Sequence, residues 1–166
     1  GDADRALALC EEGRALNRGR SGWAEAQSLR LLGDLAFEDG RHEESFELLD
    51  RSAELAEETG FRWWRVHALL TSAEYAMLLN RFQQGRASAL EALSIAHDIG
   101  HRQGVAYGLG LLAWAAAAQG QPERAGRLWG AIEADEERGH IGQWEQERET
   151  YARRVLDASG SDFERG

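Results

Sequence analysis

Residues 32–40 read LGDLAFEDG, and this stretch decides the fold of the chain. When the sequence is shifted against itself by forty positions, Gly40 aligns with Asn80 and Gly120. Each of these three residues precedes a new run of polar and then apolar side chains. Self-similarity with a fixed period of this length indicates an array of repeats, in which each unit buries its apolar face against its neighbours.

A second recurrent feature is a small residue five positions after each of these joints. Ser45, Gly85 and Ala125 share this register. A larger side chain there would push two paired helices apart, because a packed interior accommodates extra volume poorly. Gly33 has the equivalent place on the preceding helix. The sequence therefore predicts hairpins of two closely packed helices.

The apolar residues within each unit recur at three- and four-residue intervals, which is the helical period and not the strand period. Glycine, or Asn80 in its place, ends most runs, as is typical of helix C-termini. We expect an all-α fold without strands. The predicted helices are 2–18, 22–39, 42–58, 62–79, 82–98, 102–119, 122–138 and 143–158.

These helices group into five predicted units. Residues 1–20 form the second helix of a truncated repeat, residues 21–60, 61–100 and 101–139 form full repeats, and residues 140–166 form a C-terminal capping helix and tail. The first helix lacks its hairpin partner and the chain lacks an initiator methionine, so we expect a fragment that begins in the middle of a repeat. A helix covered on one side only also favours self-association into a homo-oligomer.

The stretch 32–40 followed by Ser45 resembles the tetratricopeptide signature, which is leucine-glycine, an aromatic residue, glycine and then a small residue. Units longer than the standard ~34 residues resemble the sensor arms of bacterial signal-transduction ATPases, namely the large ATP-binding LuxR-type regulators and the AfsR-like antibiotic-pathway regulators. Residues 121–131, QPERAGRLWGA, are similar to the last repeat of that group, and residues 139–158 to its capping helix. The resemblance implies a right-handed superhelix of antiparallel helix pairs with a repeat of about forty residues.

Composition and charge exclude several classes of function. A formal net charge of −10 disfavours direct binding to nucleic acid or to an anionic membrane. All 19 basic residues are arginine, so neither Schiff-base chemistry nor a phosphate-loop lysine is available. No apolar run is long enough to span a membrane. The single cysteine, Cys10, cannot form an internal disulfide, which is consistent with the cytoplasm.

No arrangement of residues points to a catalytic, cofactor-binding or metal site. His97 and His101 have the spacing of two zinc ligands on one helix, but Gly100 lies between them and should end the helix. The many carboxylates of residues 43–58 are spread around a solvated face. We therefore expect a protein that is not an enzyme and that needs no cofactor.

The resemblance also implies where a partner binds, because the first helix of each pair lines the concave face of such arrays. By register, the predicted partner-binding residues are Arg30, Asp34, Phe37, His67, Leu70, Glu74, Met77, Tyr107 and Trp114. An alternative for Met77, Tyr107 and Trp114 is packing against a neighbouring helix or the capping helix. Trp63 and Trp64 form a second candidate surface, because adjacent helical residues point about 100° apart and cannot both reach one core.

The leading hypothesis is a non-catalytic module that binds a protein or peptide, a small-molecule ligand or another domain of the same parent chain. In this hypothesis it is the sensing or interaction arm of a larger bacterial transcriptional or signal-transduction regulator. These residues contain neither a phosphate-binding loop nor a helix-turn-helix candidate, so the ATPase and DNA-binding parts would lie elsewhere in that parent. The alternative is a free-standing adaptor or scaffold that mediates oligomerisation or complex assembly.

Overall fold

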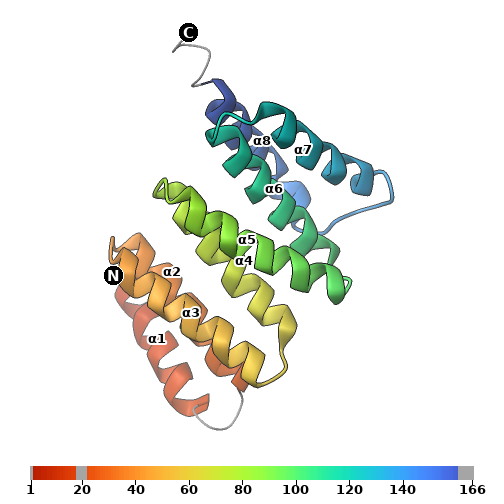
Figure 1. Cartoon of the computed structure of the whole chain (residues 1–166). Coiled ribbons are helices and arrows are strands. Elements are labelled where there is room, and N and C mark those ends of the chain that lie inside the picture. Colours follow the sequence, from red (N-terminus) through yellow and green to blue (C-terminus); the bar gives the residue numbers. More distant parts are fainter. Residues whose placement is uncertain (1, 18–21, 161–166) are drawn as a thin grey trace. The chain divides into compact units, whose positions relative to one another are not determined.

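The computed structural model describes residues 2–17 and 22–160, and every regular element in this part of the chain is an α-helix (Figure 1). The helices are α1 (Asp2–Asn17), α2 (Gly22–Glu38), α3 (His42–Glu58), α4 (Arg62–Leu78), α5 (Phe82–Asp98), α6 (Arg102–Ala118), α7 (Pro122–Glu136) and α8 (Trp144–Gly160). The all-α prediction is confirmed, and every predicted helix end within the described residues lies no more than two residues from the observed one. The predicted helix end at residue 18 and the predicted tail beyond residue 160 lie outside the described residues.

The joints after α2, α4 and α6 have the same backbone geometry. Gly40, Asn80 and Gly120 have φ angles of 78°, 59° and 68°, in the left-handed region. The next N–H in each joint donates back to a carbonyl of the last helical turn, as Arg41 does to Ala36 at 2.8 Å. This is the hydrogen bond of a Schellman motif, which ends a helix and turns the chain sharply. Asparagine tolerates the left-handed conformation better than most residues, which explains why Asn80 can replace glycine.

The chain divides into two compact units at Ser72 and Ala73, within α4. The N-terminal unit contains α1, α2, α3 and the first part of α4. This division does not test the predicted repeat limits, which stay a prediction. In this unit α2 packs against α3, where Leu29 and Leu49 are buried. A Cβ atom on Gly33 would lie 3.0 Å from Cγ of Leu49, so the helices approach closely at this glycine.

The C-terminal unit contains the rest of α4 together with α5, α6, α7 and α8. Its central helix is α6, which packs against α5, α7 and α8. Small residues make this possible, because alanine and glycine predominate among the buried positions of α6. The close approach of α4 and α5 has the same cause: a Cβ atom on Gly85 would lie only 2.8 Å from the carbonyl oxygen of Ala73. None of the described helices is both long and apolar enough to cross a membrane.

Candidate partner-binding surfaces

Helix α8 lies against α6 at Gly110. Trp144 and Tyr151 are seven residues apart on α8, which places them on one face of the helix, and both are almost fully buried. A Cβ atom on Gly110 would lie 2.9 Å from Cη2 of Trp144 and 3.1 Å from Cδ1 of Tyr151. The two rings therefore fill the space that this glycine leaves open.

Tyr107 completes an aromatic layer between α6 and α8. Its ring meets those of Trp144 and Tyr151 edge to face, with centroids 5.2 and 5.7 Å apart, a favourable arrangement for aromatic pairs. Burial raises the pKa of the Tyr107 hydroxyl, and the nearby carboxylates of Glu147 and Glu74 raise this pKa further. Tyr107 is a predicted partner-binding residue, and in this structure α8 covers one side of its ring.

The carboxylate of Glu74 connects α4 to α8 within the C-terminal unit. It accepts hydrogen bonds from the Tyr151 hydroxyl at 3.1 Å and from Nη1 of Arg154 at 2.6 Å. The guanidinium group of Arg154 lies 5.1 Å from the ring centroid of Trp114, a cation–π contact. Met77, another predicted partner-binding residue on α4, is buried, with an exposed fraction of 1%. The structure thus brings Glu74, Tyr107 and Trp114 together under α8.

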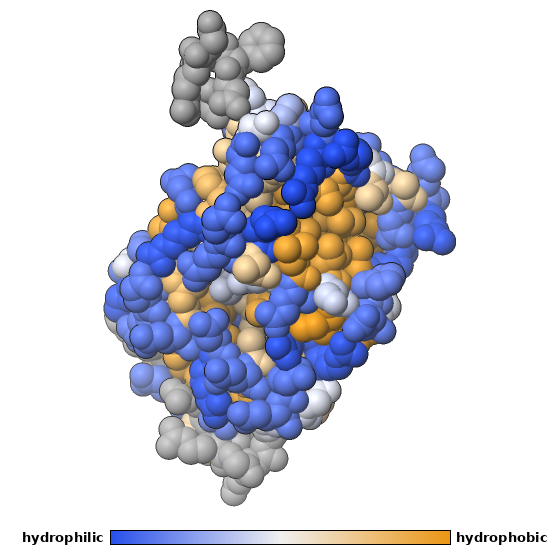
Figure 2. Space-filling view, in the orientation of Figure 1, coloured by the Kyte–Doolittle hydropathy of each residue, from blue (hydrophilic) through white to orange (hydrophobic). Residues whose placement is uncertain are grey.

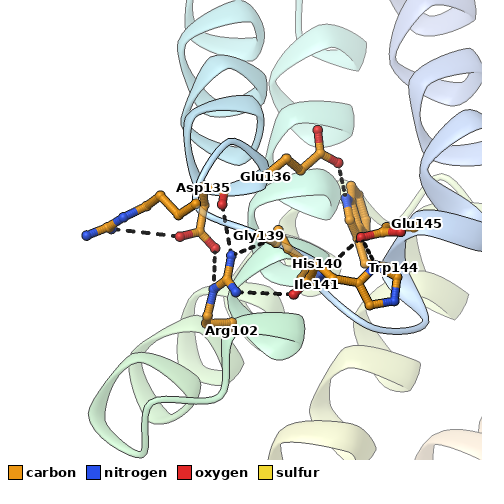
Figure 3. A network of polar contacts seen from close by, with 9 residues as sticks. Arg102, Asp135, Glu136, Gly139, His140, Ile141, Trp144 and Glu145 are labelled. Carbon is orange, nitrogen blue, oxygen red and sulfur yellow. Dashed lines mark hydrogen bonds and ion pairs between the residues drawn. The ribbon is translucent and has the colours of Figure 1, made fainter.

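The loop between α7 and α8 is fixed by Arg102 at the start of α6 (Figure 3). Its guanidinium group donates to the Asp135 carboxylate at 3.0 Å and to the backbone carbonyls of Asp135, Gly139 and His140 at 2.8, 3.0 and 3.2 Å. The Asp135 carbonyl belongs to the last turn of α7, and the carbonyls of Gly139 and His140 follow the end of that helix, where helical backbone partners are absent. Beside them, Trp144 Nε1 donates to Glu136 at 3.0 Å. These contacts hold the loop in place and so fix the position at which α8 begins.

The predicted binding residues of the N-terminal unit are only partly accessible. Arg30 and Asp34 form an ion pair at 2.7 Å on α2, with side chains about a quarter exposed. The Phe37 ring packs against His42 of α3, with centroids 4.9 Å apart. Leu70 is buried at 8% exposure and presents little surface to a partner.

Three tryptophans and a histidine cluster at the starts of α2 and α4, and we call Trp23, Trp63, Trp64 and His67 the tryptophan cluster. The rings of Trp23 and Trp64 are nearly parallel, with centroids 6.4 Å apart, and Trp63 meets Trp64 edge to face at 4.7 Å. His67 packs on Trp63 with centroids 3.9 Å apart. Trp23 and Trp63 are 42% and 44% exposed, whereas Trp64 is half-buried. The two adjacent tryptophans thus have different environments.

Sequence reasoning missed Trp23 as a member of this surface. The signal was present, because Trp23 and Trp63 are forty positions apart and both open a helix. The flanking side chains are basic: Arg62 is exposed, and Arg65 forms an ion pair with Glu57. The surface therefore combines three tryptophan rings with neighbouring arginine side chains.

The described part of the chain contains no group of three or more His, Cys, Asp or Glu side chains that could hold a metal ion. His97 lies in the last turn of α5, whereas His101 precedes α6, and Gly100 between them has a φ of 68°. The two imidazoles therefore belong to different elements, as the sequence predicts.

Comparison with known proteins returns no match: no family model, no curated protein and no solved structure is significantly similar to this chain. The class that the structure itself defines is an all-helical, repeat-like fold.

Proposed function

We propose that this chain is a tetratricopeptide-type repeat module that holds a protein or peptide partner, or another domain of its parent chain. The observation that carries the proposal is the recurrence of the helix bounds. Helices α2, α4 and α6 begin at residues 22, 62 and 102, and α3, α5 and α7 begin at residues 42, 82 and 122. Regular recurrence of this kind supports stacked hairpins, which commonly serve as extended binding surfaces.

The tryptophan cluster is the surface that best suits a partner. Tryptophan is the residue type most enriched among the energetically dominant contacts of protein interfaces. Trp23 and Trp63 expose large apolar rings, and Arg62, next to Trp63 in the sequence, is exposed as well. By contrast, Glu74, Tyr107 and Trp114 contact α8, which covers part of their surface.

Within this proposal the parent protein is a bacterial transcriptional or signal-transduction regulator of the cytoplasm, and the module is its sensing or interaction arm. The reading frame that encodes the parent provides the test. We expect nucleotide-binding motifs upstream of this module or a helix-turn-helix downstream of it. A frame that encodes helical repeats alone would contradict the regulator and favour an adaptor.

The partner surface is tested separately by binding of the parent's remaining domains, measured by isothermal titration calorimetry. We expect the Trp23→Ala/Trp63→Ala double variant to weaken binding at least about tenfold, because truncation of a dominant interface residue typically has an effect of this size. Trp129→Ala is the matched control, because Trp129 lies on α7 in the other unit. Equal affinities of the two variants would contradict the proposed surface.

One observation favours the second candidate, an adaptor that assembles through copies of itself. Leu9 and Leu16 of α1 are 59% and 60% exposed, although both are large and apolar. Sedimentation at increasing concentration would show association, and the Leu9→Ser/Leu16→Ser variant would reduce it. A monomer at every concentration would contradict this candidate.

A further inference from the structure

Helices α5, α6 and α7 of the C-terminal unit surround a cavity of about 350 Å³. This volume lies within the range of small-molecule sites. Its floor is aliphatic and is formed by Val105, Ala106, Leu109, Ala131, Ile132 and Ala134. Figure 2 shows apolar surface over α6 and α7 with hydrophilic residues around it. The partner surface proposed above does not include this cavity.

The polar groups of the cavity lie at the ends of the helices. Arg102, Asp135 and Arg138 line the cavity there, together with His97. Two guanidinium groups therefore face a single carboxylate, in a chain whose formal net charge is −10. This local excess of positive charge favours an anionic ligand over a cationic one.

The two arginines differ in what they can offer to a ligand. Arg102 already donates to Asp135 and to three carbonyls of the following loop. Arg138 has a side chain that is 79% exposed, and its nitrogen lies 3.8 Å from the Asp135 carboxylate. That distance is too long for a hydrogen bond. Arg138 can therefore turn toward a carboxylate without losing a strong contact.

We propose that this cavity binds a small amphipathic anion, namely an aliphatic carboxylate. Its hydrocarbon chain lies on the floor formed by α6 and α7, and its carboxylate pairs with Arg138 at the rim. The floor side chains carry no hydrogen-bonding groups, so a sugar or another polyhydroxylated ligand would leave hydroxyls unpaired there. Arginine matches a carboxylate with two parallel hydrogen bonds, which fixes the orientation of the ligand.

Calorimetry on the full chain with octanoate as the probe tests the site. We expect saturable binding at one site, and hexanoate should bind more weakly by up to about fourfold for each CH₂ removed. Octylamine should bind much more weakly than octanoate, because its charge has the wrong sign for the rim. Octanol, which lacks the carboxylate, should bind about tenfold more weakly than octanoate.

Two variants with matched controls separate the rim from the floor. Arg138→Gln should weaken octanoate binding about tenfold while leaving octanol binding unchanged. Arg127→Gln, which lies on α7 outside the cavity, should change neither. Ala131→Phe should abolish binding of both ligands by filling the cavity. Gly130→Phe is its control, because a Cβ at Gly130 meets no atom within 4 Å and the residue does not line the cavity.

Circular dichroism of each variant shows whether the helices persist, so loss of binding is distinguished from loss of fold. Octanol and octanoate binding with equal affinity would overturn the assignment of the rim. Equal effects of Ala131→Phe and Gly130→Phe would overturn the assignment of the floor. Absence of any saturable octanoate binding to the unaltered chain would overturn the site altogether.

Discussion

Arg154 of α8 donates a hydrogen bond to the carboxylate of Glu74 in α4 at 2.6 Å, although the two residues are 80 positions apart in the sequence. The hydroxyl of Tyr151 donates to the same carboxylate at 3.1 Å. Both side chains of the ion pair are only about a quarter exposed, so water screens their attraction less than it screens a surface pair. This contact ties α8 to the part of α4 that belongs to the C-terminal unit.

Reversing the charge of Arg154 should therefore loosen α8. We expect Arg154→Glu to lower the free energy of unfolding by about 1–3 kcal/mol, because it leaves Glu74 facing a like charge in a partly desolvated place. Urea denaturation provides the measurement. Arg153→Glu is the control: its pair with Glu149 is largely solvent-exposed, and such pairs contribute little. The double exchange Glu74→Arg/Arg154→Glu should recover part of the loss, and no recovery would contradict a direct pair.

Gly110 should be intolerant of even one additional carbon. A Cβ there would lie 2.9 Å from the buried Trp144 ring, and that ring is confined by Tyr107 and Tyr151. We expect Gly110→Ala to destabilise the protein by about 1 kcal/mol, although alanine is the better helix former.

The matched control for Gly110→Ala is Gly130→Ala, because a Cβ at Gly130 meets nothing within 4 Å. There the gain in helix propensity is unopposed, and thermal unfolding should show stabilisation of about 0.5–1 kcal/mol. The same sign for both substitutions would mean that the rings of α8 do not occupy the space at Gly110.

Gly85 tests the close approach of paired helices in the same way. The carbonyl oxygen of Ala73 would lie 2.8 Å from its Cβ, and backbone cannot move aside as a side chain can. Gly85→Leu should cost about 1–3 kcal/mol by overpacking, and Ala125→Leu should do likewise because Ala125 is 2% exposed. Gly126→Leu, at an exposed position of α7, should be neutral or stabilising in denaturant titrations. A neutral result at both Gly85 and Ala125 would contradict this packing.

The helix ends could be predicted from the sequence because their cause is local. A left-handed residue such as Gly40 or Asn80 ends a helix wherever it occurs, and the forty-residue register repeats the signal. The position of α8 could not be predicted in the same way. It depends on Glu74 meeting Arg154 across 80 positions, and periodicity carries no information about such pairs.

The candidate surfaces also differ in how far the sequence could predict them. Trp63 and Trp64 stand out in the sequence as adjacent tryptophans. The forty-residue register relates Trp23 to Trp63, but it does not predict that the Trp23 ring stacks on Trp64, a contact between α2 and α4. The cavity beside Arg138 has no sequence signal, because alanine, valine and leucine that line a cavity have the same helical spacing as residues that fill a core.

The last prediction concerns alkaline pH. Burial raises the pKa of Tyr151 well above its usual value, and the Glu74 carboxylate raises this pKa further, against a smaller opposing effect of Arg154. A tyrosine in the unfolded chain ionises near pH 10. Above that pH the unfolded state releases a proton that the folded state retains, so the free energy of unfolding falls as pH rises toward the folded pKa.

Below about pH 9 this contribution of Tyr151 should be complete and constant. Above pH 10 it should decline by up to about 1.4 kcal/mol per pH unit. All 19 basic residues are arginine, so no lysine titrates in the same range. A Cys10→Ser background removes the one thiol, whose pKa is raised by burial and by Asp34. In that background Tyr151→Phe should be less stable at pH 8, because it lacks the bond to Glu74, and should lose less stability between pH 9 and 11. Parallel pH profiles of the two proteins would contradict the burial of the Tyr151 hydroxyl beneath α8.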